Sequence, residues 1–119
     1  TLNKAKQLAN ELACEHGDLT QLPRLKNYTA IINTLPEIPA WLKPADLLPK
    51  SFAMDIVYQP IHTPFLQIAT QANCVCIPGY EMYIQQALKQ IQRWFQAGGT
   101  QLALIEKQMR DYFIRLSHY

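Results

Sequence analysis

The chain has 119 residues, of which 49 % are hydrophobic and 17 % charged, and its formal net charge is +2. This composition is typical of at most one ordinary globular domain and excludes a disordered chain. The basic residues are scattered without forming a stripe, so nothing indicates nucleic-acid binding. No apolar stretch approaches the roughly 20 residues that span a bilayer, and no signal peptide is recognisable, so we expect a soluble, cytosolic protein without a membrane partner.

The first 27 residues predict a helix and a loop. Apolar side chains recur at helical spacing after Thr1, which is suited to cap a helix, and Gly17 is suited to end it, so we expect a helix over residues 2–16. The polar, proline-interrupted residues 18–27 predict a loop. Since the chain lacks an initiator methionine and starts on a helix whose apolar stripe needs a sheet to cover, we expect a fragment of a longer protein.

The middle of the chain predicts three short strands. Residues 29–33 and 52–58 are apolar on both faces, which suits buried parallel strands, and residues 74–77 form a third apolar run. Four prolines make residues 35–50 an irregular excursion with at most a single turn around 45–48, and such long loops are often functional.

A helical crossover and a helical pair complete the prediction. Thr63 and Pro64 are suited to start a helix over residues 64–72, and a helix between two strands makes those strands parallel. Residues 80–96 and 101–117 carry apolar stripes at helical spacing, with a break at Gly98-Gly99 and a cap at Thr100. We therefore expect an α/β fold, half of a doubly wound sheet with a C-terminal helical pair.

In open parallel sheets a ligand lies beyond the carboxyl ends of the strands, which draws attention to four residues. Asp55 is an acid within an apolar strand and needs a partner, either in a structural hydrogen bond or in a site. Tyr58 could reach a ligand in the crevice or belong to the core. Gly79 permits close approach to the backbone or simply makes a turn. Gln86 could bind hydroxyl groups or remain on the surface.

Other polar residues give weaker signals. Lys4 could pair with an anion at the start of the first helix or be solvated, and Glu81 is favoured in an early helical turn by the helix dipole. We expect Cys74 and Cys76, the two cysteines of the Cys-Val-Cys run, in the core. No spacing typical of a metal site or a triad is found among the histidines and cysteines, which are His16, His62, His118, Cys14, Cys74 and Cys76. The chain has no Gly-x-Gly-x-x-Gly sequence.

Three strings together carry a family resemblance. Asp55-Ile-Val-Tyr58, Thr63-Pro-Phe-Leu66 and Gly79-Tyr-Glu-Met82, with Gln86 four residues later, resemble the C-terminal part of shikimate dehydrogenases. The run from Ala30 to Thr34 is similar to a strand of that family ending in an Asn-Ala/Thr turn. Thr1, with Lys4 and Ala5, is similar to the end of its Asn-Arg-Thr motif and the helix that follows.

The resemblance implies part of an NADP-dependent oxidoreductase that interconverts 3-dehydroshikimate and shikimate by hydride transfer in aromatic amino-acid biosynthesis. It implies that residues 1–119 are the C-terminal part of a Rossmann-like NADP-binding domain, whose partner is the N-terminal part of the same enzyme. It places six residues near NADP, namely Thr1 and Lys4 at the 2′-phosphate, Thr34 and Leu35 along the cofactor, and Ile56 and Gly79 near the nicotinamide. It places Tyr58 and Gln86 on the substrate.

The sequence departs from the family pattern in two ways. The family commonly has Gly-Leu-Gly-Met where this chain has Gly-Tyr-Glu-Met, and Glu81 is similar to the variant in bifunctional dehydroquinate dehydratase/shikimate dehydrogenase proteins. The family's glycine-rich loop and its catalytic Lys–Asp pair would lie upstream of Thr1, so we expect no catalytic residue and no metal ligand in this chain. The alternative is a non-catalytic, truncated Rossmann-like module that acts in protein assembly, and the upstream sequence would discriminate the two.

Overall fold

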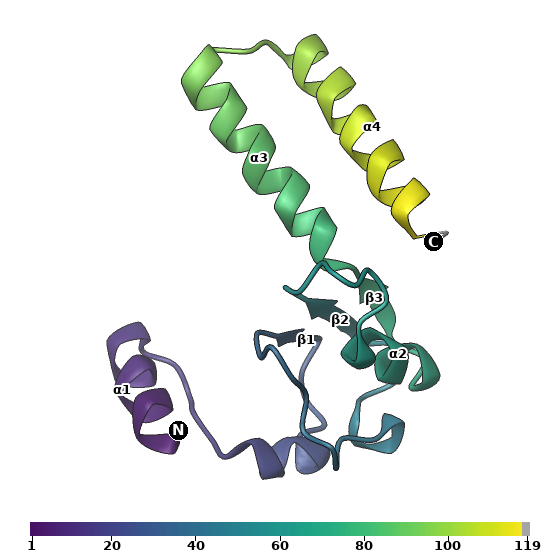
Figure 1. Cartoon of the computed structure of the whole chain (residues 1–119). Helices are drawn as coiled ribbons and strands as arrows, with labels where there is room; N and C mark the ends of the chain where they lie inside the picture. Colours follow the sequence, from purple (N-terminus) through teal and green to yellow (C-terminus); the bar gives the residue numbers. More distant parts are fainter. Residues whose placement is uncertain (118–119) are drawn as a thin grey trace.

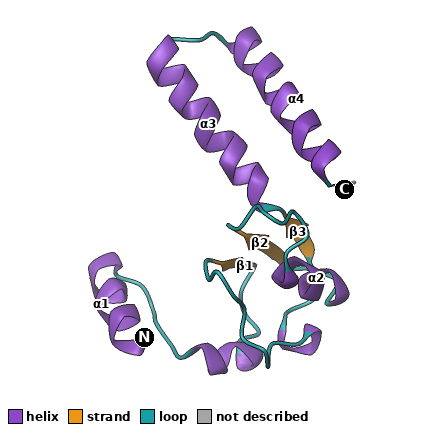
Figure 2. Cartoon of the chain, in the orientation of Figure 1, coloured by secondary structure: helices purple, strands orange, loops and turns teal. Residues whose placement is uncertain are grey.

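The structure is a computed structural model that describes residues 1–117, so His118 lies outside the described residues. Three parallel strands form one sheet in the order β1-β2-β3, and helices precede, connect and follow them (Figure 2). The strands are β1 (Ala30–Asn33), β2 (Phe52–Asp55) and β3 (Val75–Ile77). Asn33 lies opposite Asp55 in the register, and the predicted parallel α/β half-sheet is confirmed.

One face of the sheet carries the core. Helix α2 (Pro64–Gln71) crosses from β2 to β3 and buries Phe65, Leu66 and Ala69 against Ala53 of β2. Leucines from the irregular 35–50 segment close this core, and that segment contains only a short 3-10 helix, Pro44–Asp46. Cys74 and Cys76 are half-buried against the same core, so their prediction as core residues on one face of the sheet is confirmed.

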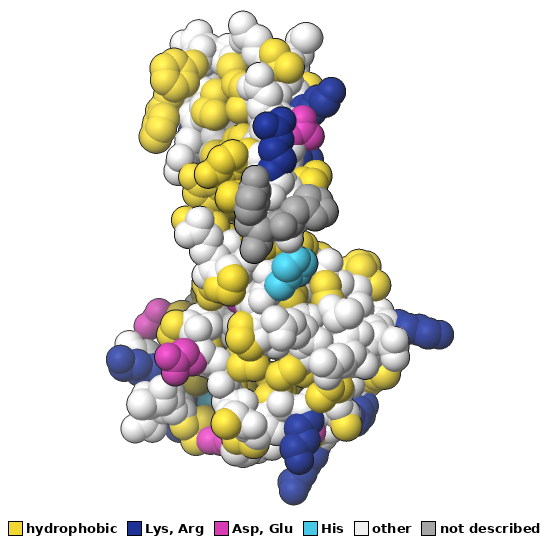
Figure 3. Space-filling view, turned by 45° about the vertical axis from the view of Figure 1, so that its right-hand side comes forward, with side chains coloured by type: hydrophobic (Ala, Val, Ile, Leu, Met, Phe, Trp, Pro, Cys, Tyr) yellow, Lys and Arg dark blue, Asp and Glu magenta, His cyan; other side chains and the backbone are white. Residues whose placement is uncertain are grey.

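The opposite face of the sheet is open. Ile32 is 57 % exposed, Phe52 45 % and Val75 50 %, although each belongs to a strand. The prediction of strands buried on both faces was therefore wrong for this face, because no element in the described part of the chain covers it. Figure 3 shows hydrophobic side chains at the surface of both the sheet region and the helices.

Helices α3 (Gly79–Phe95) and α4 (Gly99–Leu116) form an antiparallel hairpin that projects from the sheet (Figure 1). Ile84, Leu88 and Phe113 are buried between them, which confirms the predicted helical pair and its apolar seam. Trp94 and Phe95 are largely exposed at the far end. No helix within residues 1–117 combines the length and apolarity that a membrane crossing requires.

Two predicted helix boundaries need correction. Helix α1 (Leu2–Leu12) ends before Gly17, because Ala13 takes the left-handed conformation (φ 52°) and the Cys14 amide donates to the Ala9 carbonyl at 3.0 Å. Helix α4 begins at Gly99 rather than after a Thr100 cap, since Gly98 is the N-cap residue and its amide donates to the Gln101 side chain.

The predicted loop and the second strand also differ from the structure. A 3-10 helix, Leu19–Arg24, lies within the predicted loop and begins where the Asp18 carboxylate accepts hydrogen bonds from Thr20. Strand β2 stops at Asp55 instead of Tyr58, because the Asp55 carboxylate accepts the Val57 amide at 3.0 Å and turns the chain. Tyr58 therefore lies in the turn after the strand.

Candidate functional site at the carboxyl ends of the strands

A buried carboxylate organises the carboxyl ends of β1 and β2. The Asp55 side chain is 1 % exposed, and both of its oxygens accept hydrogen bonds. Oδ1 accepts from Asn33 Nδ2 at 3.1 Å and from the Val57 amide at 3.0 Å, while Oδ2 accepts from Thr63 Oγ1 at 2.6 Å. Burial of a carboxylate is tolerated where several donors replace its water, and these three donors meet that need.

The same network connects three elements. Asn33 ends β1, Asp55 ends β2, and Thr63 caps α2 by accepting the Leu66 amide at 3.2 Å. Asn33 also binds both backbone groups of Leu35, with its Oδ1 accepting and its Nδ2 donating. Three donors of the chain bind the Asp55 carboxylate, which gives this residue the structural role that was one of its two predicted roles. The network fixes the strand ends from which the predicted site residues project.

Gly79 lies against the backbone that follows β2. A Cβ at this position would sit 2.5 Å from the Val57 carbonyl oxygen and 2.6 Å from the Asp55 carbonyl oxygen. These distances are far inside van der Waals contact, so the start of α3 approaches the end of β2 only because residue 79 has no side chain. This contact brings Gly79 beside Ile56, whose amide donates to the Asn33 carbonyl at 3.1 Å.

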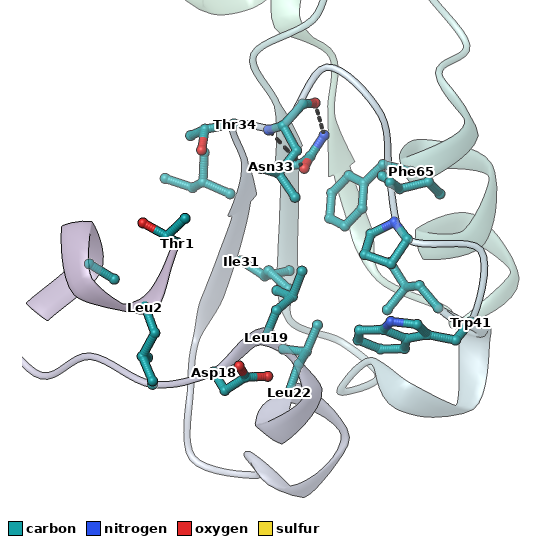
Figure 4. Close-up of a pocket in the computed structure, with 17 residues that line it drawn as sticks. Thr1, Leu2, Asp18, Leu19, Leu22, Ile31, Asn33, Thr34, Trp41 and Phe65 are labelled. Atoms are coloured by element: carbon teal, nitrogen blue, oxygen red, sulfur yellow. Dashed lines mark hydrogen bonds between the residues drawn. The ribbon is translucent and has the colours of Figure 1, made fainter.

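A cavity of about 560 Å³ lies between α1 and the edge strand β1 (Figure 4). Thr1, Thr34 and Leu35 all line it, so the structure brings together three of the six residues predicted near the cofactor. Most of the remaining wall is apolar, and Trp41 lies at the end away from Thr34. Lys4 is exposed on α1 and does not line the cavity.

Asp18 gives this cavity a fixed negative charge at the end away from Thr34. Hydrogen bonds from the Thr20 hydroxyl at 2.6 Å and from the Thr20 amide at 2.9 Å lower the pKa of the Asp18 carboxyl. An anionic group is therefore better accommodated near Thr1 and Thr34 than near Asp18.

Tyr58 lines a second cavity of about 470 Å³, formed with α3 and α4. Its ring stacks on Tyr83 at a centroid distance of 5.1 Å and meets the edge of Phe113 at 6.4 Å. Gln86 is exposed on α3 and lines neither this cavity nor the one beside β1. The two residues predicted on the substrate are thus not brought into one cavity within residues 1–117.

No protein-family model matches the chain. The chain is, however, similar to several known proteins whose names refer to shikimate dehydrogenase or shikimate biosynthesis. It is 30 % identical over 101 residues to shikimate dehydrogenase (NADP(+)) of Ignicoccus hospitalis, an alignment covering 82 % of this chain and 38 % of the relative. It is 35 % identical over 94 residues to shikimate biosynthesis protein AroDE of Chlamydia muridarum, covering 76 % of the chain and 18 % of the relative. Shikimate dehydrogenase (NADP(+)) of Cereibacter sphaeroides is 34 % identical over 105 residues, which cover 78 % of the chain and 38 % of the relative. The chain belongs to the shikimate dehydrogenase family. It spans well under half the length of these relatives, and the resemblance to the family's C-terminal part is confirmed.

Two parts of the site in this family member were not predicted. Asn33 was predicted at the end of a strand, but its bond to Asp55 needs the parallel register that pairs the two residues, which sequence spacing alone does not give. Arg110 pairs with Glu81 across the helical hairpin. Its other partner, Glu106, was detectable as an i,i+4 pair.

Metal-binding side chains do not gather in the part of this shikimate dehydrogenase family member that the structure describes. Residues 1–117 contain no group of three His, Cys, Asp or Glu side chains placed to hold an ion, and His16 and His62 are both exposed.

Proposed function

We propose that the chain is the C-terminal part of the NADP-binding domain of a cytosolic shikimate dehydrogenase, which interconverts 3-dehydroshikimate and shikimate by hydride transfer. The observation that carries this proposal is the alignment of about four-fifths of the chain with a relative named for that activity and cofactor. The N-terminal part of the same polypeptide would supply the glycine-rich loop and the proton-transfer pair, which the family resemblance places upstream of Thr1.

The residues present fit part of a dinucleotide. The 560 Å³ cavity joins the N-terminus of α1 to the carboxyl end of β1, and Thr1, Thr34 and Leu35 line it. The first amides of α1 have no side-chain cap, so they are available to an anion, and Lys4 adds a positive charge in the same turn. Thr1 and Lys4 would hold the 2′-phosphate, and Thr34 and Leu35 would lie along the cofactor.

Ile56 and Gly79 would form the wall beside the nicotinamide. They are neighbours because Gly79 lies directly on the Asp55–Val57 backbone, and the buried Asp55 network fixes that backbone. When bound, NADP accepts the hydride that shikimate loses. The contribution of this wall is to exclude water and to fix one side of the site, which lowers the cost of orienting the reactants.

Tyr58 and Gln86 would bind shikimate through hydroxyl and amide groups. A phenol and a carboxamide each donate and accept hydrogen bonds, which suits a ligand with several hydroxyls and a carboxylate. Both would position the substrate rather than move its proton, so this chain contributes no general acid or base.

The direct test is an intact-mass measurement of the natural protein together with an assay of NADP reduction by shikimate. A mass well above the 13.7 kDa of this chain with turnover is the expected result. A full-length protein that does not oxidise shikimate would overturn the proposal.

The open sheet face supports a second candidate function. Ile32, Phe52 and Val75 expose apolar surface on one face of the sheet, and β1 is an edge strand. In the dehydrogenase this surface would meet the rest of the polypeptide. In a non-catalytic assembly module it would meet another chain, and a natural protein of 13.7 kDa without activity would favour that function.

Replacement of Gln86 by alanine in the full-length enzyme should raise the KM for shikimate about tenfold and leave the KM for NADP unchanged. The reason is the loss of a hydrogen-bonding amide that faces the substrate alone, worth roughly 1 kcal/mol or more. Steady-state kinetics with each reactant varied in turn would measure both constants. Gln85→Ala, also exposed on α3, is the matched control, and equal changes in both KM values would remove Gln86 from the substrate.

Replacement of Lys4 by alanine should raise the KM for NADP about fivefold and leave the KM for NAD unchanged. The reason is that only NADP carries the 2′-phosphate that the ammonium group attracts. The measurement is the ratio of the KM values for the two cofactors. Lys6→Ala is the control, since Lys6 is also an exposed lysine of α1. An unchanged NADP/NAD ratio in Lys4→Ala would exclude Lys4 from the phosphate site.

A further inference from the structure

An ion pair ties the first turn of α3 to the C-terminal half of α4. Both carboxylate oxygens of Glu81 accept from Arg110 Nη1, and Arg110 also donates through Nε and Nη2 to Glu106 Oε1, at 3.1 and 2.8 Å. The two carboxylates raise the pKa of the Arg110 guanidinium, so the arginine stays charged. Glu106 lies on the same helix as Arg110, so within this three-charge network the Glu81 contact is the one that connects the two helices.

The ion pair borders the aromatic cluster that contains Tyr58. In the sequence of α3, Glu81 directly follows Tyr80 and precedes Tyr83 by two residues. On α4, Phe113 follows Arg110 by almost one helical turn. Phe113 is 5 % exposed and stacks on Tyr80 at a centroid distance of 5.1 Å. The helix face that carries Arg110 therefore also carries the ring that fills this cluster.

Tyr58 depends on this cluster for its position. It lies in the segment between β2 and α2, which has no regular secondary structure, and its ring packs on the rings of Tyr83 and Phe113. If α4 shifted along α3, Phe113 would move with it and the Tyr58 ring would lose its edge contact with Phe113. The docking of α4 on α3 therefore places one of the two rings on which Tyr58 packs.

We propose that Glu81 and Arg110 are positioning residues for Tyr58, holding α4 on the first turns of α3 so that Phe113 backs the Tyr58–Tyr83 stack. The proposal rests on the proposed function, in which Tyr58 contacts the substrate. A single exposed ion pair contributes little, but a two-oxygen contact within a three-charge network on half-buried side chains orients groups more firmly. Removing Arg110 would also leave Glu81 and Glu106 facing each other without the cation.

The experiment compares Glu81→Gln with Glu106→Gln in the full-length enzyme. Glu81→Gln breaks the contact between helices and should raise the KM for shikimate about fivefold, with the KM for NADP unchanged. Glu106→Gln breaks only the contact within α4 and should leave both constants unchanged. The reversed pair Glu81→Arg/Arg110→Glu should recover most of the loss. Arg110→Lys keeps the positive charge but lacks the planar guanidinium group, so it should give an intermediate KM for shikimate. It replaces Glu81→Gln as the test if that variant does not fold.

The outcomes separate the two proposals. A wild-type enzyme that does not oxidise shikimate overturns the proposed function, and the positioning role falls with it. An active wild type with an unchanged shikimate KM in Glu81→Gln overturns the positioning role alone. That role is also overturned where Glu106→Gln raises the shikimate KM as much as Glu81→Gln does, or where the reversed pair is no better than Glu81→Gln.

Discussion

Replacing Asp55 by alanine should lower the free energy of unfolding of the domain by about 3 kcal/mol or more. The substitution leaves the Asn33 amide, the Val57 N–H and the Thr63 hydroxyl without their shared acceptor in a buried site. Each buried donor without a partner costs roughly 1–3 kcal/mol, so the sum is a large share of the ~5–15 kcal/mol that stabilises an ordinary domain. Urea unfolding of the full-length protein, followed by circular dichroism, measures the change.

Two further variants make the Asp55 result specific. Asp55→Asn keeps the shape but offers one acceptor oxygen and an amide donor to a site that holds three donors, so it should also destabilise strongly. Asp111→Ala removes an exposed acid from α4 and should change stability by less than about 0.5 kcal/mol. Should Asp55→Ala lose no more stability than Asp111→Ala, the network would not be a structural centre of the domain.

Local sequence features predicted most of the secondary structure. The Thr63-Pro64 start of α2 and the apolar seam between α3 and α4 depend on neighbours within four residues, and both are present. The parallel pairing of β2 with β3 follows from the helical crossover α2. These features could be read from the chain because each is determined by residues close together in the sequence.

Local hydrogen bonds that end a helix or strand early, and contacts between distant residues, were harder to predict. The end of α1 at Ala13 and the early end of β2 are set by hydrogen bonds that compete with the regular pattern, not by Gly17 or by the apolar run to Tyr58. The partner of Glu81 is 29 residues away, and its identity requires the docking of two helices. The prediction that Tyr58 and Gln86 contact one substrate is not decided by local features either, because Tyr58 lines the cavity beside α3 and α4 and Gln86 does not.

Replacing Gly79 by alanine should reduce stability by about 2–3 kcal/mol and impair turnover with both shikimate and NADP. The new Cβ would lie 2.5 to 2.8 Å from the carbonyl group of Val57 and 2.6 Å from the Asp55 carbonyl oxygen. These are backbone atoms held by the Asp55 network, so they cannot rotate away as a flexible side chain would, and an overpacked site costs ~1–3 kcal/mol. Relief requires α3 to move from the end of β2, which displaces Ile56 and Tyr58 from both halves of the proposed site.

Gly99→Ala separates this effect from the general consequence of placing alanine in a helix. Gly99 begins α4, and a Cβ there would meet no atom within 4 Å, so this variant should be as stable as the wild type or up to about 1 kcal/mol more stable. Unfolding midpoints and both KM values should be measured for the two variants under one set of conditions. Normal stability and kinetics in Gly79→Ala would mean that α3 and β2 separate at no cost, and the close contact would then not be what places the nicotinamide wall.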